Sequence, residues 1–468
     1  MIDPSSLPPR ISDVVRAGAA RTPTAPALVD NARAWSYGEL QCDVERQARQ
    51  LRELGVRGGD RVMIISENCA AQVALLFAIA RLDAWSVNVN ARLSQGELAA
   101  IRAHCTPRRV LTITEHGEVV AGPLDPDTVP EPVRRDAGQV AALVYTTGTT
   151  GQPKGVMLTH ANLLFVAATS STLRGLQPSD VACGVLPITH VYGFSSVMLG
   201  TLYAGACLHL MPRFSAEALL EQIRSNVLTI VQGVPAMYAR LLALAGSEPV
   251  PSRLRFCYVG GSPLDPVLKR EVERVFGLPL HNGYGLTESG PTVSQTRLDA
   301  PRADTSVGHP IPGVEVRIVE GTGELWVRGP NVMAGYYRDP EQTRAALRPG
   351  GWLATGDVAT MGPDGALFIA GRLKELIIRS GFNVYPLEVE TALNSHPAVL
   401  QSAVVGRPAG AGEEEVVAYV ERTGDIDAAA LRDWLQTRLA PYKRPSRIVF
   451  MDALPAAPSG KVLKSRLP

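Results

Sequence analysis

The feature that most constrains the fold is the alternation of short apolar runs with amphipathic stretches along most of the chain. Short apolar runs bounded by turn residues are typical of buried strands, and the stretches between them have the spacing of helices that bury one face. Strands are predicted at 61–66, 141–145, 229–231 and 256–259, and helices at 217–225 and 266–276. This order predicts a doubly wound α/β fold.

From about Glu315 the sequence pattern changes to strands that are separated by glycine-rich and aspartate-rich turns. These strands are predicted at 314–319, 323–329 and 365–372. A mixed segment follows, with helices expected at 387–393 and 428–439. We therefore expect a large N-terminal domain, residues 1–372, made of doubly wound α/β subdomains plus a β-rich subdomain at about 305–372. A small α+β C-terminal domain is expected at 373–468.

Composition excludes several function classes. The 468 residues carry a formal net charge of +1 and no run of like charges, so nothing predicts a nucleic-acid or membrane-surface partner. The longest uncharged run, 191–212, is interrupted by glycines and is predicted to be a buried helix followed by a strand, not a membrane span. No secretory signal is visible in the first residues, MIDPSSLPPR, and six dispersed cysteines fit a reducing cytosol. A cytoplasmic location is therefore expected.

A glycine- and threonine-rich loop, YTTGTTGQPKGV at 145–156, follows the apolar run AALVY. Threonine hydroxyls, free backbone amides and the charge of Lys154 can cradle a polyphosphate. The loop is predicted to lie between a strand and a helix that Thr159 caps. It is not a Walker loop, because Pro153 and Gly155 flank the lysine.

At this loop the chain resembles the adenylate-forming superfamily of acyl-CoA synthetases, beetle luciferases and nonribosomal-peptide adenylation domains. The family motif is close to YTSGTTGxPKGV, with Thr147 here in place of serine. Four further segments match in the same order: VGGSP at 259–263, NGYGLTES at 282–289, WLATGD at 352–357 with Arg372, and PSGKVLK at 458–464. The resemblance spans about Trp35 to Lys464.

The resemblance implies a nucleotide site in which Tyr284 stacks on adenine, Thr287 contacts the α-phosphate, and Asp357 and Arg372 hold the ribose. Glu288, with Thr147, would bind Mg²⁺, and Lys461 would contact the carboxylate and α-phosphate during adenylation. The ATP-binding set that it implies is Thr146, Thr147, Gly148, Thr149, Thr150, Gly151, Lys154, Gly261, Ser262, Pro263, Asn282, Gly283, Tyr284, Gly285, Thr287, Asp357, Arg372 and Lys461.

The same resemblance implies a mobile C-terminal domain that turns about a hinge at Lys374, so that Lys461 leaves and Ser380, Gly381 and Phe382 reach coenzyme A. The catalytic residues expected are Lys461, His190 and Thr287, with His190 at the thiol tunnel. The acyl pocket is expected at His190, Tyr192, Gly193, Phe194, Val234 and Gly260.

The expected activity is that of an AMP-forming acyl-CoA synthetase that uses ATP, Mg²⁺ and coenzyme A. No acidic residue lies at 190–195 to bind an α-amino group, and Gly283 instead of a cation precedes Tyr284. These features disfavour an amino acid and a second substrate carboxylate, which leaves a neutral aryl or medium-chain acid.

Three other readings stay open. The acyl group could pass to a carrier-protein pantetheine, the adenylate could be oxidised as in luciferases, or the chain could be a nucleotide-binding regulator without turnover. The apparently complete set of catalytic residues argues against the last of these. The sequence leaves the state of association, monomer or homodimer, undecided.

Overall fold

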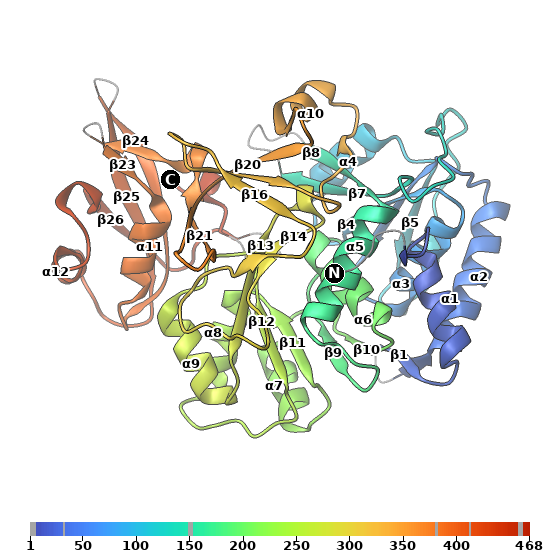
Figure 1. Cartoon of the computed structure of the whole chain (residues 1–468), viewed down its shortest axis with the longest axis horizontal. Coiled ribbons are helices and arrows are strands. Elements are labelled where there is room, and N and C mark those ends of the chain that lie inside the picture. Colours follow the sequence, from blue (N-terminus) through green and yellow to red (C-terminus); the bar gives the residue numbers. More distant parts are fainter. Residues whose placement is uncertain (1–5, 31–32, 148–152, 380–381, 411–412, 457–461) are drawn as a thin grey trace.

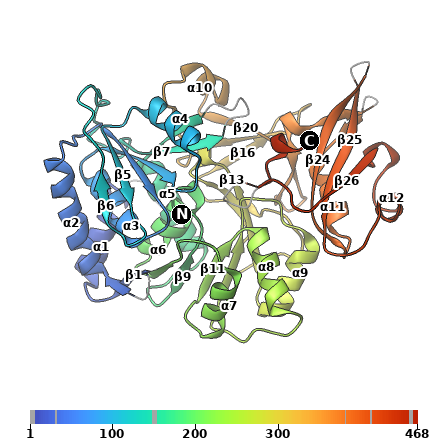
Figure 2. The same ribbon diagram turned by 180° about the vertical axis from the view of Figure 1, so that it is seen from behind.

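The computed structural model describes residues 6–30, 33–147, 153–379, 382–410, 413–456 and 462–468. A large α/β body and a smaller C-terminal lobe lie side by side in Figure 1 and, seen from behind, in Figure 2. The body contains two large sheets and one smaller sheet. Within the described ranges, no helix is both long enough and apolar enough to cross a membrane.

The first sheet has seven strands in the order β18-β8-β7-β4-β3-β5-β6. Its inner strands β7, β4, β3 and β5 pair in parallel, and the pairs toward both edges are antiparallel. Its strands are β3 (Arg61–Ser66), β4 (Trp85–Asn90), β5 (Arg109–Ile113), β6 (Val119–Ala121), β7 (Val140–Thr147), β8 (Pro153–Thr159) and β18 (Gly335–Tyr336). The parallel inner strands are buried along most of their length because helices cover them, and this burial includes the polar Ser86 and Asn88 of β4.

The second sheet has nine strands in the order β15-β14-β13-β12-β11-β9-β10-β1-β2. It is parallel from β13 to β1, and β14 turns back beside β13 at the site described below. Its strands are β1 (Pro26–Asp30), β2 (Arg33–Ser36), β9 (Val181–Gly184), β10 (Cys207–Leu210), β11 (Ile230–Gly233), β12 (Phe256–Val259), β13 (Leu280–Gly285), β14 (Thr292–Gln295) and β15 (His309–Pro310).

Helices pack on both sheets, and one core joins them. Helix α3 is buried without a break from Gln72 to Ala80, which explains why it is apolar around its whole circumference. The helices of this body are α1 (Ser12–Arg21), α2 (Tyr37–Glu53), α3 (Ala70–Arg81), α4 (Gln95–Cys105), α5 (His160–Leu173), α6 (Gly200–Tyr203), α7 (Ala216–Arg224), α8 (Pro235–Ala245) and α9 (Pro266–Phe276), with a π-helical segment, η2 (Tyr192–Leu199), before α6.

A five-stranded sheet forms the β-rich part that follows. Its long central strand β20 pairs antiparallel with β17, β19 and β21. The members are β16 (Glu315–Ile318), β17 (Glu324–Arg328), β19 (Leu347–Arg348), β20 (Trp352–Met361) and β21 (Leu367–Arg372), with α10 (Pro340–Ala346) beside them. The pairing of β20 with β21 sets Asp357 opposite Arg372.

The C-terminal lobe begins after a short 3-10 turn, η4 (Leu373–Glu375), and has a separate core of its own. It contains β22 (Ile377–Arg379), β23 (Phe382–Val384), α11 (Pro386–Asn394), β24 (Val399–Gly410), β25 (Glu413–Arg422), α12 (Ala428–Gln436) and β26 (Arg447–Met451). Lys464 Nζ lies 2.8 Å from both Glu375 and Glu390, which ties the end of the chain to η4 and α11. Burial lowers the pKa of Lys464, but the negative charges of Glu390 and Glu375 raise it by a larger amount. The pKa of Lys464 is therefore higher than its ordinary value.

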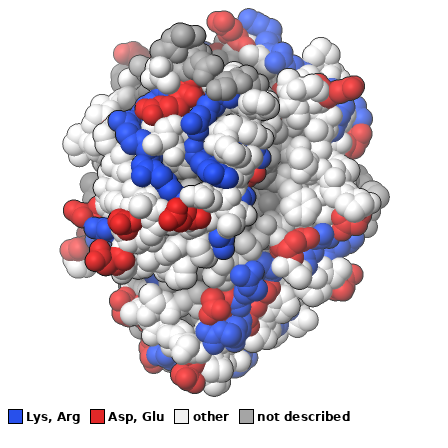
Figure 3. Space-filling model, turned by 90° about the vertical axis from the view of Figure 1, so that its left-hand side faces the viewer, with Lys and Arg blue, Asp and Glu red and all other residues white. Residues whose placement is uncertain are grey.

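Charges on the face that shows the C-terminal lobe are mixed in sign. In Figure 3, lysine and arginine side chains are interrupted by aspartate and glutamate and form no continuous basic field. Ion pairs of this lobe include Lys443 with Glu388, whose closest atoms are 2.6 Å apart.

Most element predictions are confirmed. Strands β3 and β12 and helix α9 have the predicted bounds, and β11 and α7 differ from them by one or two residues. The uncharged run is η2 and α6 followed by β10, as predicted.

Two buried histidines make the folded state sensitive to acid. Burial, with Lys269 second, lowers the pKa of His281 to about 4, and burial, with Arg10 second, lowers that of His160 to about 3. The unfolded chain takes up these protons as pH falls below about 6.5, whereas the folded chain does not. Stability should therefore fall from pH 6.5 downward, by up to about 2 kcal/mol per histidine at pH 5.

Urea unfolding midpoints at pH 7 and pH 5 measure this loss. The variant His281→Asn should show a smaller drop between the two pH values than the parent chain. An equal drop in both proteins would show that His281 does not contribute.

Candidate functional site

The predicted phosphate loop connects two strands, which corrects the predicted strand-loop-helix order. Strands β7 and β8 form a hairpin in which Thr146 lies opposite Lys154, and α5 begins only at His160. Residues Pro153 to Thr159 are mostly apolar and pair with β7, so the chain runs back along the sheet before the helix. Thr159 does cap α5, as predicted, by accepting a hydrogen bond from the Asn162 amide at 3.1 Å. Loop residues Gly148, Thr149, Thr150 and Gly151 and the side chain of Thr147 lie outside the described residues.

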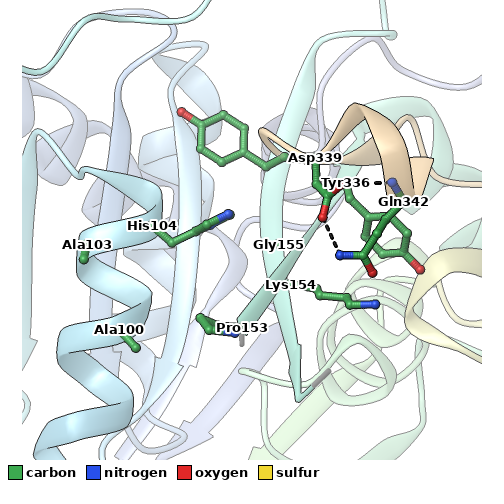
Figure 4. Close-up of a pocket in the computed structure, with 10 residues that line it drawn as sticks. Ala100, Ala103, His104, Pro153, Lys154, Gly155, Tyr336, Asp339 and Gln342 are labelled. Carbon is green, nitrogen blue, oxygen red and sulfur yellow. Dashed lines mark hydrogen bonds between the residues drawn. The ribbon is translucent and has the colours of Figure 1, made fainter. Parts of the chain in front are cut away.

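A cavity of about 590 Å³ adjoins this hairpin (Figure 4). It is lined by residues of α4, β8, β18 and α10, among them His104, Lys154, Tyr336, Asp339 and Gln342. Lys154 Nζ lies 5.5 Å from the centroid of the Tyr336 ring, a cation–π contact. The hairpin thus presents its lysine beside a hollow that is open to a ligand.

Tyr336 also contacts the predicted metal ligand. Its hydroxyl donates a hydrogen bond to Glu288 Oε1 at 2.8 Å. Burial, followed by the negative charge of Glu288, raises the pKa of the Tyr336 phenol, so the tyrosine stays protonated. Tyr336 therefore lies between Lys154 and Glu288, which places the loop lysine and the carboxylate in one site. Tyr336 carries no functional signal in the sequence, because a tyrosine in a short strand is typical of ordinary sheet packing.

A second group joins the β-rich sheet to β13. The Tyr284 hydroxyl donates to Asp357 Oδ2 at 2.5 Å, and Arg372 Nε lies 3.2 Å from Asp357 Oδ1. Burial and then Asp357 raise the pKa of Tyr284. Asp357 is buried, whereas half of the Arg372 side chain is exposed. The structure therefore brings together the three residues predicted to hold adenosine, and it places the Asp357 carboxylate next to the Arg372 guanidinium.

Backbone around Tyr284 is tightly packed, which accounts for its glycines. A Cβ at Gly283 would lie 1.8 Å from the Tyr258 hydroxyl, and one at Gly285 would lie 1.5 Å from the Pro291 carbonyl oxygen. Asn282 donates to the Thr305 and Ser306 carbonyls at 3.2 Å. Thr287, buried, begins the 3-10 turn η3 (Thr287–Ser289) that carries Glu288.

The predicted acyl residues lie in and around η2. Tyr192, Gly193 and Phe194 are buried in this π-helical segment, a geometry common at functional sites. A Cβ at Gly260 would lie 3.7 Å from the Tyr192 ring and 3.6 Å from the Gly283 carbonyl oxygen, so these residues meet. His190 is exposed at the start of this segment, and its Nδ1 accepts from the Tyr192 amide at 3.2 Å.

The loop after β12 is close to this group. Gly261 has a φ of +80°, and a Cβ there would lie 3.6 Å from a methyl carbon of Val234, the N-cap of α8. Gly261 and Pro263 are exposed and Ser262 is half-buried. The loop thus runs at the surface between the acyl residues and solvent.

Of the residues predicted to act from the C-terminal lobe, Phe382 and Lys374 lie among the described residues. Phe382 is 54% exposed and stacks on Tyr442, with ring centroids 4.6 Å apart, inside the lobe. Lys374 is exposed in the turn η4. Ser380, Gly381 and Lys461 lie outside the described residues.

The described ranges contain no cluster of three or more histidine, cysteine, aspartate or glutamate side chains able to hold a metal. A metal at Glu288 would therefore draw its other ligands from substrate phosphates and water. Magnesium binds in this way, through one or two carboxylates and phosphate oxygens.

A doubly wound α/β enzyme with a separate C-terminal lobe is the class that this fold defines. The family model described as AMP-binding enzyme matches residues 15–337, and that of the AMP-binding enzyme C-terminal domain matches 388–461. The chain therefore belongs to the AMP-binding enzyme family.

Curated relatives and solved structures agree with this family assignment. A feruloyl-CoA synthase from Amycolatopsis sp. is 36% identical over 96% of both chains, and 4-coumarate–CoA ligase 2 of Oryza sativa subsp. japonica is 32% identical over 99% of this chain and 92% of its own length. The o-succinylbenzoate CoA synthetase of Bacillus subtilis, solved with its acyl-adenylate intermediate, has a TM-score of 0.86 at 30% identity, with 97% of both chains covered. The predicted family, fold class and enzyme class, an AMP-forming acyl-CoA synthetase, are thereby confirmed.

Proposed function

We propose that this chain joins an aromatic carboxylic acid to coenzyme A through an acyl adenylate. A carboxylate oxygen would attack the α-phosphorus of ATP, and the bond to the bridging oxygen would break and release pyrophosphate. The thiol of coenzyme A would then attack the acyl carbon, and AMP would leave. The observation that carries this proposal is the hydrogen-bonded group Tyr284, Asp357 and Arg372, which offers a ring, a carboxylate and a cation to a nucleoside.

The nucleoside roles follow from these contacts. Asp357 can accept hydrogen bonds from both ribose hydroxyls, and its bond to Tyr284 fixes the orientation of the ring. Arg372, half exposed beside Asp357, can reach the ribose or a phosphate. Gly283 and Gly285 make room for the Tyr258 hydroxyl and the Pro291 carbonyl oxygen, so the backbone that carries Tyr284 is held by close packing.

At the phosphate end, we assign Lys154, Thr146 and the loop amides to the β- and γ-phosphates, and Thr287 to the α-phosphate. Glu288 would hold Mg²⁺, which when bound neutralises charge on the phosphate oxygens. Nucleotidyl transfer needs alignment and charge neutralisation more than a nucleophilic side chain. This supports a ligase whose own residues bind and orient the two substrates.

An aromatic acid is favoured by the rings at the acyl residues. Tyr192 and Tyr258 meet edge to face with centroids 6.2 Å apart, beside Gly260 and Gly283. Such rings and glycines suit a flat group. The relatives named for ferulate, 4-coumarate and o-succinylbenzoate all act on aromatic acids, which supports the same substrate class here.

We place the domain boundary at residues 372–374, with Lys374 as the hinge and Ser380, Gly381 and Phe382 as contacts to coenzyme A. The exposed turn η4, between β21 and a lobe with its own core, supports this position. His190 is assigned to the path of the thiol, because it is exposed next to the acyl residues. Six free cysteines fit a reducing compartment, so we infer a cytoplasmic location.

Glu288→Gln is expected to raise the Mg²⁺ concentration that half-maximal pyrophosphate release requires by about tenfold or more, because the carboxylate assigned to the metal is lost. The release is measured in a magnesium titration at saturating ATP and acid. Glu341→Gln removes an exposed carboxylate from α10 and should leave the titration unchanged. An unchanged titration in Glu288→Gln would remove the metal assignment.

Pyrophosphate release across a panel of aryl and C4 to C16 acids, with and without coenzyme A, tests the function. Sustained release with aryl acids that needs coenzyme A supports the proposal. A single stoichiometric burst that coenzyme A does not extend would point to a carrier-protein acceptor. Release with aliphatic acids alone would contradict the aromatic substrate class.

A further inference from the structure

A buried arginine lies next to the acyl residues and takes no part in the nucleotide site. Arg174 follows α5, is 1% exposed, and places its guanidinium carbon 4.0 Å from the centroid of the Tyr258 ring. Its Nη1 donates to Gln232 Oε1 at 2.5 Å. Gln232 lies on β11 directly opposite Tyr258 on β12.

Several donors of this group lack partners. The Nε and Nη2 atoms of Arg174 and the Nε2 atom of Gln232 are buried without a hydrogen-bond partner, and so is the hydroxyl of Tyr192. Within the described ranges, no carboxylate forms an ion pair with Arg174; its printed contacts are Gln232 and Tyr258. Burying an unpaired charge and unsatisfied donors is costly, so a partner is expected when the site is filled.

We call the group of Arg174, Gln232, Tyr258 and Tyr192 the arginine cluster. It extends from the acyl residues further into the protein. The Tyr258 hydroxyl occupies the space that a side chain at Gly283 would need, and the rings of Tyr192 and Tyr258 both flank Gly260. Burial raises the pKa of both tyrosines, and the positive charge of Arg174 opposes that rise at each of them. The cluster therefore borders the place assigned to the acyl group.

The cluster is separate from the residues assigned to the reacting phosphate. Its free donors come from α5 and β11, whereas Thr287 and Glu288 follow β13 and Asp357 belongs to β20. An acid whose carboxylate faces the α-phosphate would present a different part of its structure to Arg174.

We propose that Arg174 and Gln232 select acids that carry a hydrogen-bond-accepting oxygen remote from the reacting carboxylate. This inference rests on the proposed function and narrows its substrate class to oxygen-substituted aromatic acids. The accepting oxygen is a ring hydroxyl, ether or carbonyl oxygen, or that of a second carboxylate. Arg174 is distant from Tyr284 in the sequence, and folding brings it to the acyl residues from the end of α5.

The test measures kcat/KM for acid-dependent pyrophosphate release with two matched pairs of acids. One pair is an arylpropenoic acid with and without a ring hydroxyl, and the other is a benzoic acid with and without a side chain that ends in a carboxylate. The parent chain should prefer the oxygenated member of at least one pair by about tenfold or more, because unpaired buried donors penalise the plain acid. The pair that shows the preference identifies which oxygen is recognised.

Arg174→Met keeps the bulk and removes the donors, and should bring that ratio close to one while the plain acid reacts within about threefold of the parent rate. Gln232→Leu should reduce the ratio in part. This variant replaces Arg174→Met as the test if Arg174→Met does not fold. Arg213→Met, which removes an exposed arginine paired with Glu67, should leave the ratio unchanged. Activity with the plain acid shows that each variant is folded.

Equal rates for both members of both pairs in the parent chain would overturn the proposal, and so would an equal loss for both members in Arg174→Met. The latter result would mean that an internal water satisfies Arg174 and that the residue serves the fold. A parent chain inactive with every aryl acid would instead overturn the proposed function, so the two failures are distinguishable.

Discussion

Replacing Lys461 with alanine is expected to slow adenylation by roughly 10² to 10³-fold, about 3 kcal/mol or more of transition-state stabilisation. Negative charge builds up on the α-phosphate oxygens as the acid attacks, and an ammonium group placed there stabilises it. Lys461 lies in a motif that matches the family's C-terminal lysine. The rate is measured as exchange of labelled pyrophosphate into ATP, which reports adenylation without the thiol step.

A matched control is Lys443→Ala, which removes a lysine of the same lobe that pairs with Glu388. This variant should keep adenylation within about twofold of the parent, since exposed ion pairs contribute little. Thioester formation from a synthetic acyl adenylate should also survive in Lys461→Ala, because that step does not use the lysine. Full exchange activity in Lys461→Ala would remove Lys461 from the mechanism.

Lys374→Pro is expected to leave adenylation near the parent rate and to reduce thioester formation by about 10²-fold or more, because a lobe that cannot turn cannot complete the second geometry. Lys374 lies in the 3-10 turn η4. Proline fixes φ near −65°, which suits a 3-10 turn but prevents rotation about that bond. The two half-reactions are measured separately, as pyrophosphate exchange and as acyl-CoA formed from the pure adenylate.

The control is Lys374→Ala, which removes the exposed side chain but leaves the backbone free to rotate. Both half-reactions should continue in this variant. Equal loss of both half-reactions in Lys374→Pro would mean that the turn is needed for folding or binding, and normal thioester formation would mean that the hinge lies elsewhere.

Local structure could be predicted from the sequence where hydrophobic period and turn residues agree. Helix α9 begins at Pro266, with Asp265 as its N-cap and Gly277 as its C-cap, and each of these residues gives a capping or stop signal. Strands β3 and β12 are short apolar runs between polar turns, and their predicted bounds are exact. The strand β8 after the phosphate loop is not predicted, because PKGVMLT lacks strict alternation and leads directly into the helix that follows.

The contacts that assemble the site are less accessible to sequence reasoning. Asp357 and Tyr284 were identified by motif, but their hydrogen bond depends on how the β-rich sheet packs on β13. Tyr336 and Arg174 belong to no motif and enter the site only through tertiary packing. A tyrosine in a two-residue strand and an arginine after a helix are ordinary surface choices in a linear sequence.

The ion pairs of Lys464 with Glu375 and Glu390 have a mechanical consequence. These contacts hold residues 464–466, the 3-10 turn η6 (Lys464–Arg466), against η4 and α11. Residues far apart in the sequence are thereby fixed to one another on the C-terminal lobe, so any movement of that lobe would carry them together as one body.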